Sequence, residues 1–282
     1  MLTDEQRDFL FPMAYNAALR AGAAILGLYE REDEDYEISL KKDLSPLTLA
    51  DRRAHEVIKE YLGRTRVPLL SEEGREMLYQ ERVGWDLFWM VDPLDGTKEF
   101  LKGNGEFTVN IALLADNRPV LSVVYVPYRK KIYFGDRKTG AFCKENVIAE
   151  ADADMSLADI LDGARLLPLA GKCNDPIRIA ISRSHNTEET FNHVEMVKEK
   201  YPDAVVVEQG SSYKFCLIAE GSVDYYVRTS PTYEWDTAAG ELILELSGGS
   251  TVSLPGKEPL LYNKESLHNP HFVCRSKHLK EV

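Results

Sequence analysis

The sequence has little cysteine and no cysteine pattern typical of a bonded or metal-binding framework. Four of its 282 residues are cysteines, at positions 143, 173, 216 and 274, and no two of them have CxxC spacing. No histidine lies close in the sequence to the first three of them, and His271 and His278 flank the last. Isolated cysteines in mostly apolar surroundings indicate reduced structural thiols, as expected for a cytoplasmic protein.

The sequence also lacks long apolar runs and an excess of basic residues. We expect no transmembrane segment, because no run of about 20 apolar residues is present, and the acidic N-terminus does not resemble a secretory signal. Peripheral contact with the inner face of the cell membrane stays open. The formal net charge of −12 argues against a binder of nucleic acid polymers, which needs a basic face. It is compatible with a small phosphorylated substrate, because a bound cation can invert the local field.

The most informative feature that is present is an apolar segment ending in two carboxylates. Residues 86–91 predict a buried strand, and the run Asp-Pro-Leu-Asp-Gly-Thr follows at residues 92–97. We expect the strand to stop at Pro93, because proline lacks an amide donor. The glycine permits a sharp turn that would aim both carboxylates at one point. Hard cations such as Mg²⁺ prefer such oxygen ligands.

Three further acids stand at similar transitions. Glu72 follows the short apolar segment 67–70, Asp236 opens a predicted helix, and Asp51 lies where a loop enters another helix. Each has an ordinary structural alternative. An aspartate in an Asp-Pro turn often bonds to its own backbone, and an aspartate at a helix start is often a cap.

The remaining pattern predicts helices on an antiparallel-leaning sheet, followed by alternating strands and helices. Thr3 and Gln6 have capping-box spacing at the start of a long helix, in which Pro12 marks a kink or a later start. Residues 30–37 read as an acidic connector, 41–48 as a mobile loop, and 149–176 as an inserted surface loop. The second half predicts strands and helices in the order βαβαβα. The expected segments are a helix at 49–62, strands at 107–114, 120–126 and 131–134, strands at 178–182, 204–208 and 223–227, and helices at 188–200, 211–219 and 235–246.

Taken in order, these motifs resemble the inositol monophosphatase superfamily of Mg²⁺-dependent, lithium-sensitive phosphatases. The resemblance covers residues 14–273, and the segments at 45–48, 181–185, 234–240 and 259–265 resemble its 3′(2′),5′-bisphosphate nucleotidase branch. It implies an α+β fold, a layered α-β-α-β-α sandwich like that of the inositol monophosphatases and fructose-bisphosphatases. Residues 1–148 would form an N-terminal subdomain with the metal site. Residues 149–282 would form a C-terminal subdomain with the specificity elements, and one active-site cleft would lie between them in a single phosphatase domain.

The resemblance also implies roles for individual residues. Asp51 and Thr97 would orient and deprotonate a metal-activated water for in-line attack on phosphorus. Two or three Mg²⁺ ions would be held by Glu72, Asp92, Leu94 (through its carbonyl), Asp95 and Asp236. The substrate would be bound by Glu72, Leu94, Asp95, Gly96, Thr97, Ser182, His185, Gly210, Lys214 and Asp236.

The implied reaction is hydrolysis of adenosine 3′,5′-bisphosphate (PAP) to AMP and phosphate, with the sulfated relative PAPS as a second substrate. One alternative is an inositol monophosphatase or a broad-specificity sugar phosphatase, which needs no second phosphate site. Another is a non-catalytic sensor of nucleotide or metal. For Lys214 a solvated surface lysine is the ordinary alternative, and for His185 a helix-terminal polar residue. The sequence does not decide between a monomer and a homodimer.

Overall fold

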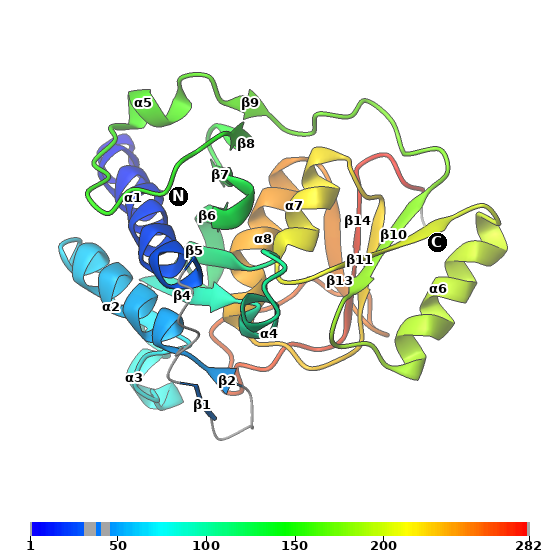
Figure 1. The fold of residues 1–282 in the computed structure, drawn as a ribbon, viewed down its shortest axis with the longest axis horizontal. Coiled ribbons are helices and arrows are strands. Elements are labelled where there is room, and N and C mark those ends of the chain that lie inside the picture. Colours follow the sequence, from blue (N-terminus) through cyan, green and yellow to red (C-terminus); the bar gives the residue numbers. More distant parts are fainter. Residues whose placement is uncertain (1, 31–37, 41–45, 281–282) are drawn as a thin grey trace.

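The computed structural model describes residues 2–30, 38–40 and 46–280. Most of the predicted acidic connector 30–37 and of the predicted loop 41–48 lies outside the described residues. The elements form five layers, with helices outside and between two sheets (Figure 1). This arrangement confirms the predicted α-β-α-β-α sandwich.

The larger sheet has the strand order β3-β4-β5-β6-β7-β8-β9. Only the β3–β4 pair is parallel in this sheet, and the other neighbours are antiparallel. The strands predicted at 107–114 and 120–126 form the antiparallel hairpin of β5 and β6. The strands are β3 (Leu69–Ser71), β4 (Leu87–Asp95), β5 (Thr108–Ala115), β6 (Arg118–Val126), β7 (Lys131–Asp136), β8 (Gly140–Glu145) and β9 (Arg165–Leu166).

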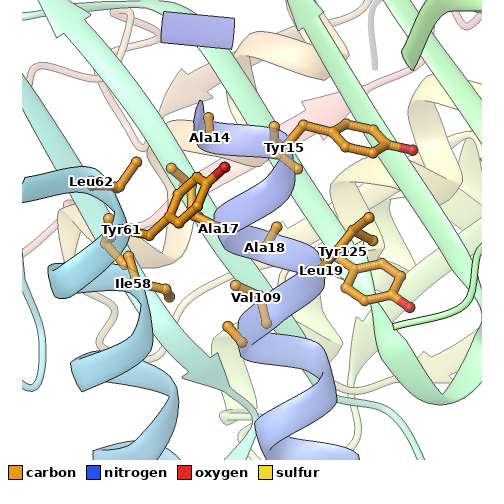
Figure 2. Packing of buried hydrophobic residues seen from close by; sticks show 14 of the residues in the cluster. Ala14, Tyr15, Ala17, Ala18, Leu19, Ile58, Tyr61, Leu62, Val109 and Tyr125 are labelled. Atoms are coloured by element: carbon orange, nitrogen blue, oxygen red, sulfur yellow. The ribbon is translucent and has the colours of Figure 1, made fainter. Parts of the chain in front are cut away.

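Helices α1 (Asp4–Tyr29) and α2 (Leu49–Gly63) cover the outer face of this sheet. Figure 2 shows why they fit closely: α1 presents the small side chains of Ala14, Ala17 and Ala18, and α2 directs larger apolar side chains toward it. Burying such apolar surface contributes about 25 cal/mol per Å². The pair therefore anchors the start of α2, which carries Asp51.

Helix α1 corrects two sequence-based expectations. It begins at Asp4 behind the predicted Thr3–Gln6 capping box, so Pro12 lies inside it and marks no later start. By length and composition α1 is also apolar enough to cross a membrane, whereas no such segment was expected. However, 61% of its most apolar window is buried inside the protein, where it packs on the sheet. Its apolar character is thus accounted for by the core.

Two helices, α7 (Tyr213–Glu220) and α8 (Glu234–Leu246), lie between the sheets, and α6 (Glu188–Lys200) covers the far face of the smaller one (Figure 1). The smaller sheet has the order β11-β10-β12-β14-β13. The predicted strand 178–182 and helix 188–200 are confirmed residue for residue. The smaller sheet contains β10 (Arg178–Ser182), β11 (Val205–Gln209), β12 (Tyr225–Arg228), β13 (Ser250–Ser253) and β14 (Phe272–Arg275).

Short elements complete the described chain. The inserted region 149–176 contains α5 and β9, and β9 adds to the larger sheet beyond the predicted subdomain division at 148/149. That division stays a prediction. The short elements are α3 (Tyr79–Arg82), α4 (Thr97–Leu101), α5 (Leu157–Leu161), the 3₁₀ turn Pro127–Arg129, and the small β1 (Ser39–Leu40) and β2 (Pro46–Leu47) pair.

Candidate active site

The carboxylate-bearing end of β4 is a bulged strand. The expectation that the strand stops at Pro93 is wrong: β4 continues to Asp95, and its pairing with β5 shifts register between Asp92 and Asp95. The shift tolerates proline because a residue inside a bulge needs no ladder hydrogen bond. The amide of Leu94 donates instead to Asp92 Oδ1 at 3.0 Å. The bulge thereby fixes the Asp92 carboxylate beside the Leu94 backbone.

Three carboxylates from three elements converge at this point. One oxygen each from Glu72, Asp92 and Asp236 lies within 4.8 Å of the others. Burial raises the pKa of Asp92 well above its ordinary value, and the charges of Glu72, Asp95 and Asp236 raise it further. The pKa of Asp236 is raised by burial first and then by the charges of Asp95 and Glu72. Carboxylates this close resist joint ionisation unless a cation lies between them, and their hard oxygen donors fit a divalent metal ion.

Asp95 stands beside this cluster and faces α7. Its Oδ2 accepts the Ser212 amide at 2.5 Å, and the Ser212 hydroxyl donates to Asn110 at 2.7 Å. Burial raises the pKa of Asp95, while Lys214 and the Ser212 amide lower it. Asp95 therefore joins the end of β4 to the start of the helix that carries Lys214.

Asp51 and Thr97 form the predicted pair. Asp51 is buried in the first turn of α2, and its Oδ2 accepts both the amide and the hydroxyl of Thr48. Thr97, the first residue of α4, donates its hydroxyl to Asp51 Oδ1 at 3.0 Å. The N-cap of α2 is Thr48, and not Asp51 as the ordinary alternative proposed. Asp51 is the N3 residue of that capping box and also the partner of Thr97.

One cavity of about 200 Å³ collects these groups. Asp51 is the one predicted site residue that does not line this cavity. It is connected to the cavity wall by its hydrogen bond with Thr97. The predicted residues in the cavity wall are Glu72, Asp92, Leu94, Asp95, Gly96, Thr97, Ser182, His185, Gly210, Lys214 and Asp236. Residues far apart in the sequence meet here because α7 and α8 pack between the sheets.

The same cavity is also lined by basic side chains, those of Lys98, Lys214 and Arg228, which we call the basic wall. Lys214 is only 2% exposed, which rules out a solvated surface lysine, and its Nζ donates to the carbonyls of Gln209 and Ser211 at 3.0 and 2.6 Å. Burial first, and Arg228 second, lower its pKa to about 7. Burial and the cations around His185 lower its pKa to about 4, so the imidazole is neutral at pH 7.

Sequence reasoning missed two basic residues of this wall, Lys98 and Arg228. Lys98 Nζ lies 2.8 Å from His185 Nε2, and Arg228 at the end of β12 donates to the carbonyls of Ser230 and Pro231. Lys98 follows Thr97 directly and could have been found from its place in the motif. Arg228 has no comparable signal, because its position depends on how β12 pairs within the smaller sheet.

Comparisons with known proteins agree with this geometry. A model of the inositol monophosphatase family matches residues 6–282. The 3′(2′),5′-bisphosphate nucleotidase CysQ of Salmonella typhimurium is 39% identical over 257 residues, which cover 90% of this chain and 95% of that protein. The crystal structure of CysQ from Bacteroides thetaiotaomicron superposes with a TM-score of 0.87 at 45% identity, covering 96% of this chain and 98% of that one. SuhB from Bartonella henselae, at 22% identity and a TM-score of 0.71, covers 94% of this chain and 93% of that one and shares the fold.

Proposed function

This chain belongs to the inositol monophosphatase family, and we propose that within it the chain acts as a 3′(2′),5′-bisphosphate nucleotidase. The reaction is hydrolysis of PAP to AMP and phosphate, with PAPS as a second substrate. The observation that carries this proposal is a single cavity lined both by clustered carboxylates and by the basic side chains of Lys98, Lys214 and Arg228. A substrate with two phosphates matches both walls at once.

The carboxylate wall would hold the metal. We infer that Glu72, Asp92 and Asp236, together with Asp95 and the Leu94 carbonyl, bind two or three Mg²⁺ ions. When bound, such ions would lower the pKa of water and offset the charge of the transferring phosphate. The raised pKa values of Asp92 and Asp236 support this assignment, because a cation would restore their ionised forms.

The Thr97–Asp51 pair would receive the proton of the attacking water. Thr97 Oγ1 can accept that proton while its own proton passes to Asp51 Oδ1, 3.0 Å away. Hydrogen bonds from Thr48 hold the other oxygen of Asp51. The two carboxylate oxygens therefore have separate tasks, one in positioning and one in proton transfer.

The transferring phosphate would lie against the turn that joins β4 to α4. Gly96 has a left-handed φ of 97°, which orients the backbone at the start of α4 toward the cavity wall. The amides of Gly96 and Thr97 would donate to phosphate oxygens there, where charge builds up during transfer. The second phosphate and the nucleoside would face Lys214, Ser182, His185 and Gly210, with Lys98 and Arg228 adding charge.

The identity of the product tests this proposal. Incubation of PAP with the protein and Mg²⁺ should yield 5′-AMP and inorganic phosphate, resolved from 3′-AMP by chromatography. Formation of 3′-AMP would show that the phosphate positions are reversed. The Asp92→Asn variant should lose turnover, because it removes a charge from the metal cluster. No turnover by the parent protein on any phosphomonoester would favour the sensor alternative.

A further inference from the structure

An ion pair outside the cavity, between the buried Glu106 and the partly exposed Arg183, joins the two halves of the active site. Glu106 lies just before β5, and its side chain accepts Arg183 Nε at 2.7 Å and Arg183 Nη2 at 2.8 Å. The same carboxylate accepts the Gly210 amide at 2.8 Å. Glu106 is 6% exposed. We name this group, made of Glu106, Arg183 and the Gly210 amide, the Glu106 clamp.

The clamp spans the gap between the two sheets. Glu106 belongs to the segment between α4 and β5, next to the turn of Gly96 and Thr97. Arg183 follows β10, two residues before His185, and Gly210 follows β11, four residues before Lys214. Arg183 Nη2 also donates to the Glu208 carbonyl at 2.9 Å, which ties the ends of β10 and β11 together. One carboxylate thus holds the segment that leads to His185 and the segment that leads to Lys214.

Close backbone contact surrounds the clamp. A Cβ on Gly210 would lie 2.6 Å from Glu99 Cγ and 2.9 Å from the Glu106 carbonyl oxygen. A Cβ on Gly96 would lie 3.0 Å from that same oxygen. The turn of Gly96 and Thr97, which we call the phosphate turn, and the turn at Gly210 therefore approach Glu106 from both sides. Neither glycine has room for a side chain.

The electrostatics favour a permanently charged clamp. Burial alone would raise the pKa of Glu106, but the hydrogen bonds from Arg183 and Gly210 outweigh it and lower the pKa. Fork-to-fork Arg–carboxylate pairing is directional as well as strong. A lysine at position 183 would keep the charge and lose the fork.

We propose that Glu106 is a positioning residue that sets the distance between the phosphate turn and the basic wall. It would thereby determine how well the enzyme accepts a substrate with two phosphates. Neither Glu106 nor Arg183 lines the cavity as the structure describes it, so both act through other residues. The substrate part of this inference rests on the proposed function.

The test compares Glu106→Gln with Arg183→Lys and a matched control. Glu245→Gln removes a similar bidentate pair, Arg137 with Glu245 at 2.7 and 2.9 Å, on the far part of α8. In Glu106→Gln, KM for PAP should rise about 10- to 100-fold. A shift of about 1 Å in the groups that position a substrate typically has an effect of this size. The kcat for the small monoester p-nitrophenyl phosphate and the melting temperature should stay near wild type. Arg183→Lys should shift KM in the same direction, and Glu245→Gln should change neither constant.

Hydrogen exchange provides a readout that needs no substrate. Amides at residues 183–187 and 210–214 should exchange faster in Glu106→Gln than in Glu245→Gln. If Glu106→Gln lost activity equally on PAP and on p-nitrophenyl phosphate and had a lower melting temperature, the proposal would be overturned in favour of a structural role. So would unchanged exchange in both segments. Failure of wild-type protein to hydrolyse PAP would instead refute the proposed function, and the exchange comparison would still decide the role of the clamp.

Discussion

At the scale of single residues, Lys214 combines burial with charge at the position that we propose for the second phosphate of the substrate. Its pKa is lowered to about 7, first by burial and then by Arg228. The charged fraction therefore falls as pH rises above 7, whereas phosphate groups with a second pKa of about 6 are already ionised there. We predict that KM for PAP rises between pH 7 and pH 9, measured by steady-state phosphate release.

Replacing Lys214 tests whether its charge causes this pH dependence. Lys214→Ala should raise KM for PAP about 10- to 100-fold, the value of a hydrogen bond to a charged group, and should remove the pH dependence. The KM for inositol 1-phosphate should change much less. An identical pH profile in the variant and the parent would contradict this role.

The residue scale also shows what a sequence can and cannot reveal. The carboxylates at 72, 92 and 95 could be predicted because acids directly after apolar segments are unusual, whereas Asp236 was predicted through the family resemblance. The burial of Lys214 could not be predicted, since it depends on the packing of α7 between two sheets. The pairing of Glu106 with Arg183 was missed for the same reason, because 77 residues separate them.

At the scale of elements, the cap of α2 holds both the helix start and Asp51, to which we assign proton transfer. Thr48 accepts the amides of Ala50 and Asp51 and donates to Asp51 Oδ2. Thr48→Ala should lower the free energy of unfolding by about 1 kcal/mol. It should also lower kcat, because Asp51 loses a partner that orients it, and Thr48→Ser should restore both quantities.

The capping box of α1 supplies the control for this prediction. Thr3→Ala removes an equivalent cap, far from Asp51, and should affect stability without changing kcat. Urea denaturation and steady-state kinetics on the three variants make the comparison. A parallel loss of kcat in Thr3→Ala would show that reduced helix stability alone explains the Thr48 effect.

The turn between β4 and α4 makes a second prediction at this scale. Gly96 and Gly103 both have positive φ, 97° and 69°, but only at Gly96 would an added Cβ meet backbone, at 3.0 Å. Gly103→Ala should cost about 1 kcal/mol from the left-handed conformation alone and leave activity intact. Gly96→Ala should cost more and abolish activity. Equal effects of the two substitutions on stability and turnover would contradict close packing at the turn.

Helices and strands were predicted correctly where the hydrophobic periodicity is strong. The predictions failed where pairing with distant strands determines the structure. Residues 188–200 have a helical pattern and form α6 as predicted. Pro93 was expected to end β4, yet the bulge removes the need for its missing donor. Strands β13 and β14 were not predicted, because their short segments become strands only by pairing with each other and with β12.

At the scale of the whole molecule, the metal cluster should link stability to pH. The folded, metal-free protein raises the pKa of Asp92 and Asp236 above their ordinary value of 3.8, so it binds more protons than the unfolded chain above that pH. The contribution of these protons to stability is present at low pH and is lost as pH rises through the raised pKa values. With EDTA present, the melting temperature should therefore fall as the pH rises from about 4.

Magnesium should reverse this trend, because it binds the ionised carboxylates. At about 100 times its dissociation constant, a ligand of the folded state alone stabilises by about 2.7 kcal/mol. Thermal denaturation with and without Mg²⁺ should show the largest difference near pH 8. Asp92→Asn should weaken both the metal effect and the pH dependence, and no metal-dependent shift in the parent at pH 8 would contradict the assignment of this cluster.

The five-layer arrangement places the proposed metal ligands and the proposed specificity residues mostly on different elements. The larger sheet supplies most of the carboxylate wall through β3 and β4, and the smaller sheet with α7 supplies most of the basic wall. The resemblance predicted this division of roles, but the sequence alone could not place the two walls at a common cavity. That placement depends on α7 and α8 packing between the sheets.

The most direct test of the account is a comparison of kcat/KM for PAP and for inositol 1-phosphate, measured by phosphate release in the same Mg²⁺ buffer. The two-walled cavity predicts a clear preference for PAP, because only a bisphosphate engages the carboxylate-bound metal and the basic wall together. A preference for inositol 1-phosphate would contradict the proposed function and would assign the chain to the monophosphatase branch of its family.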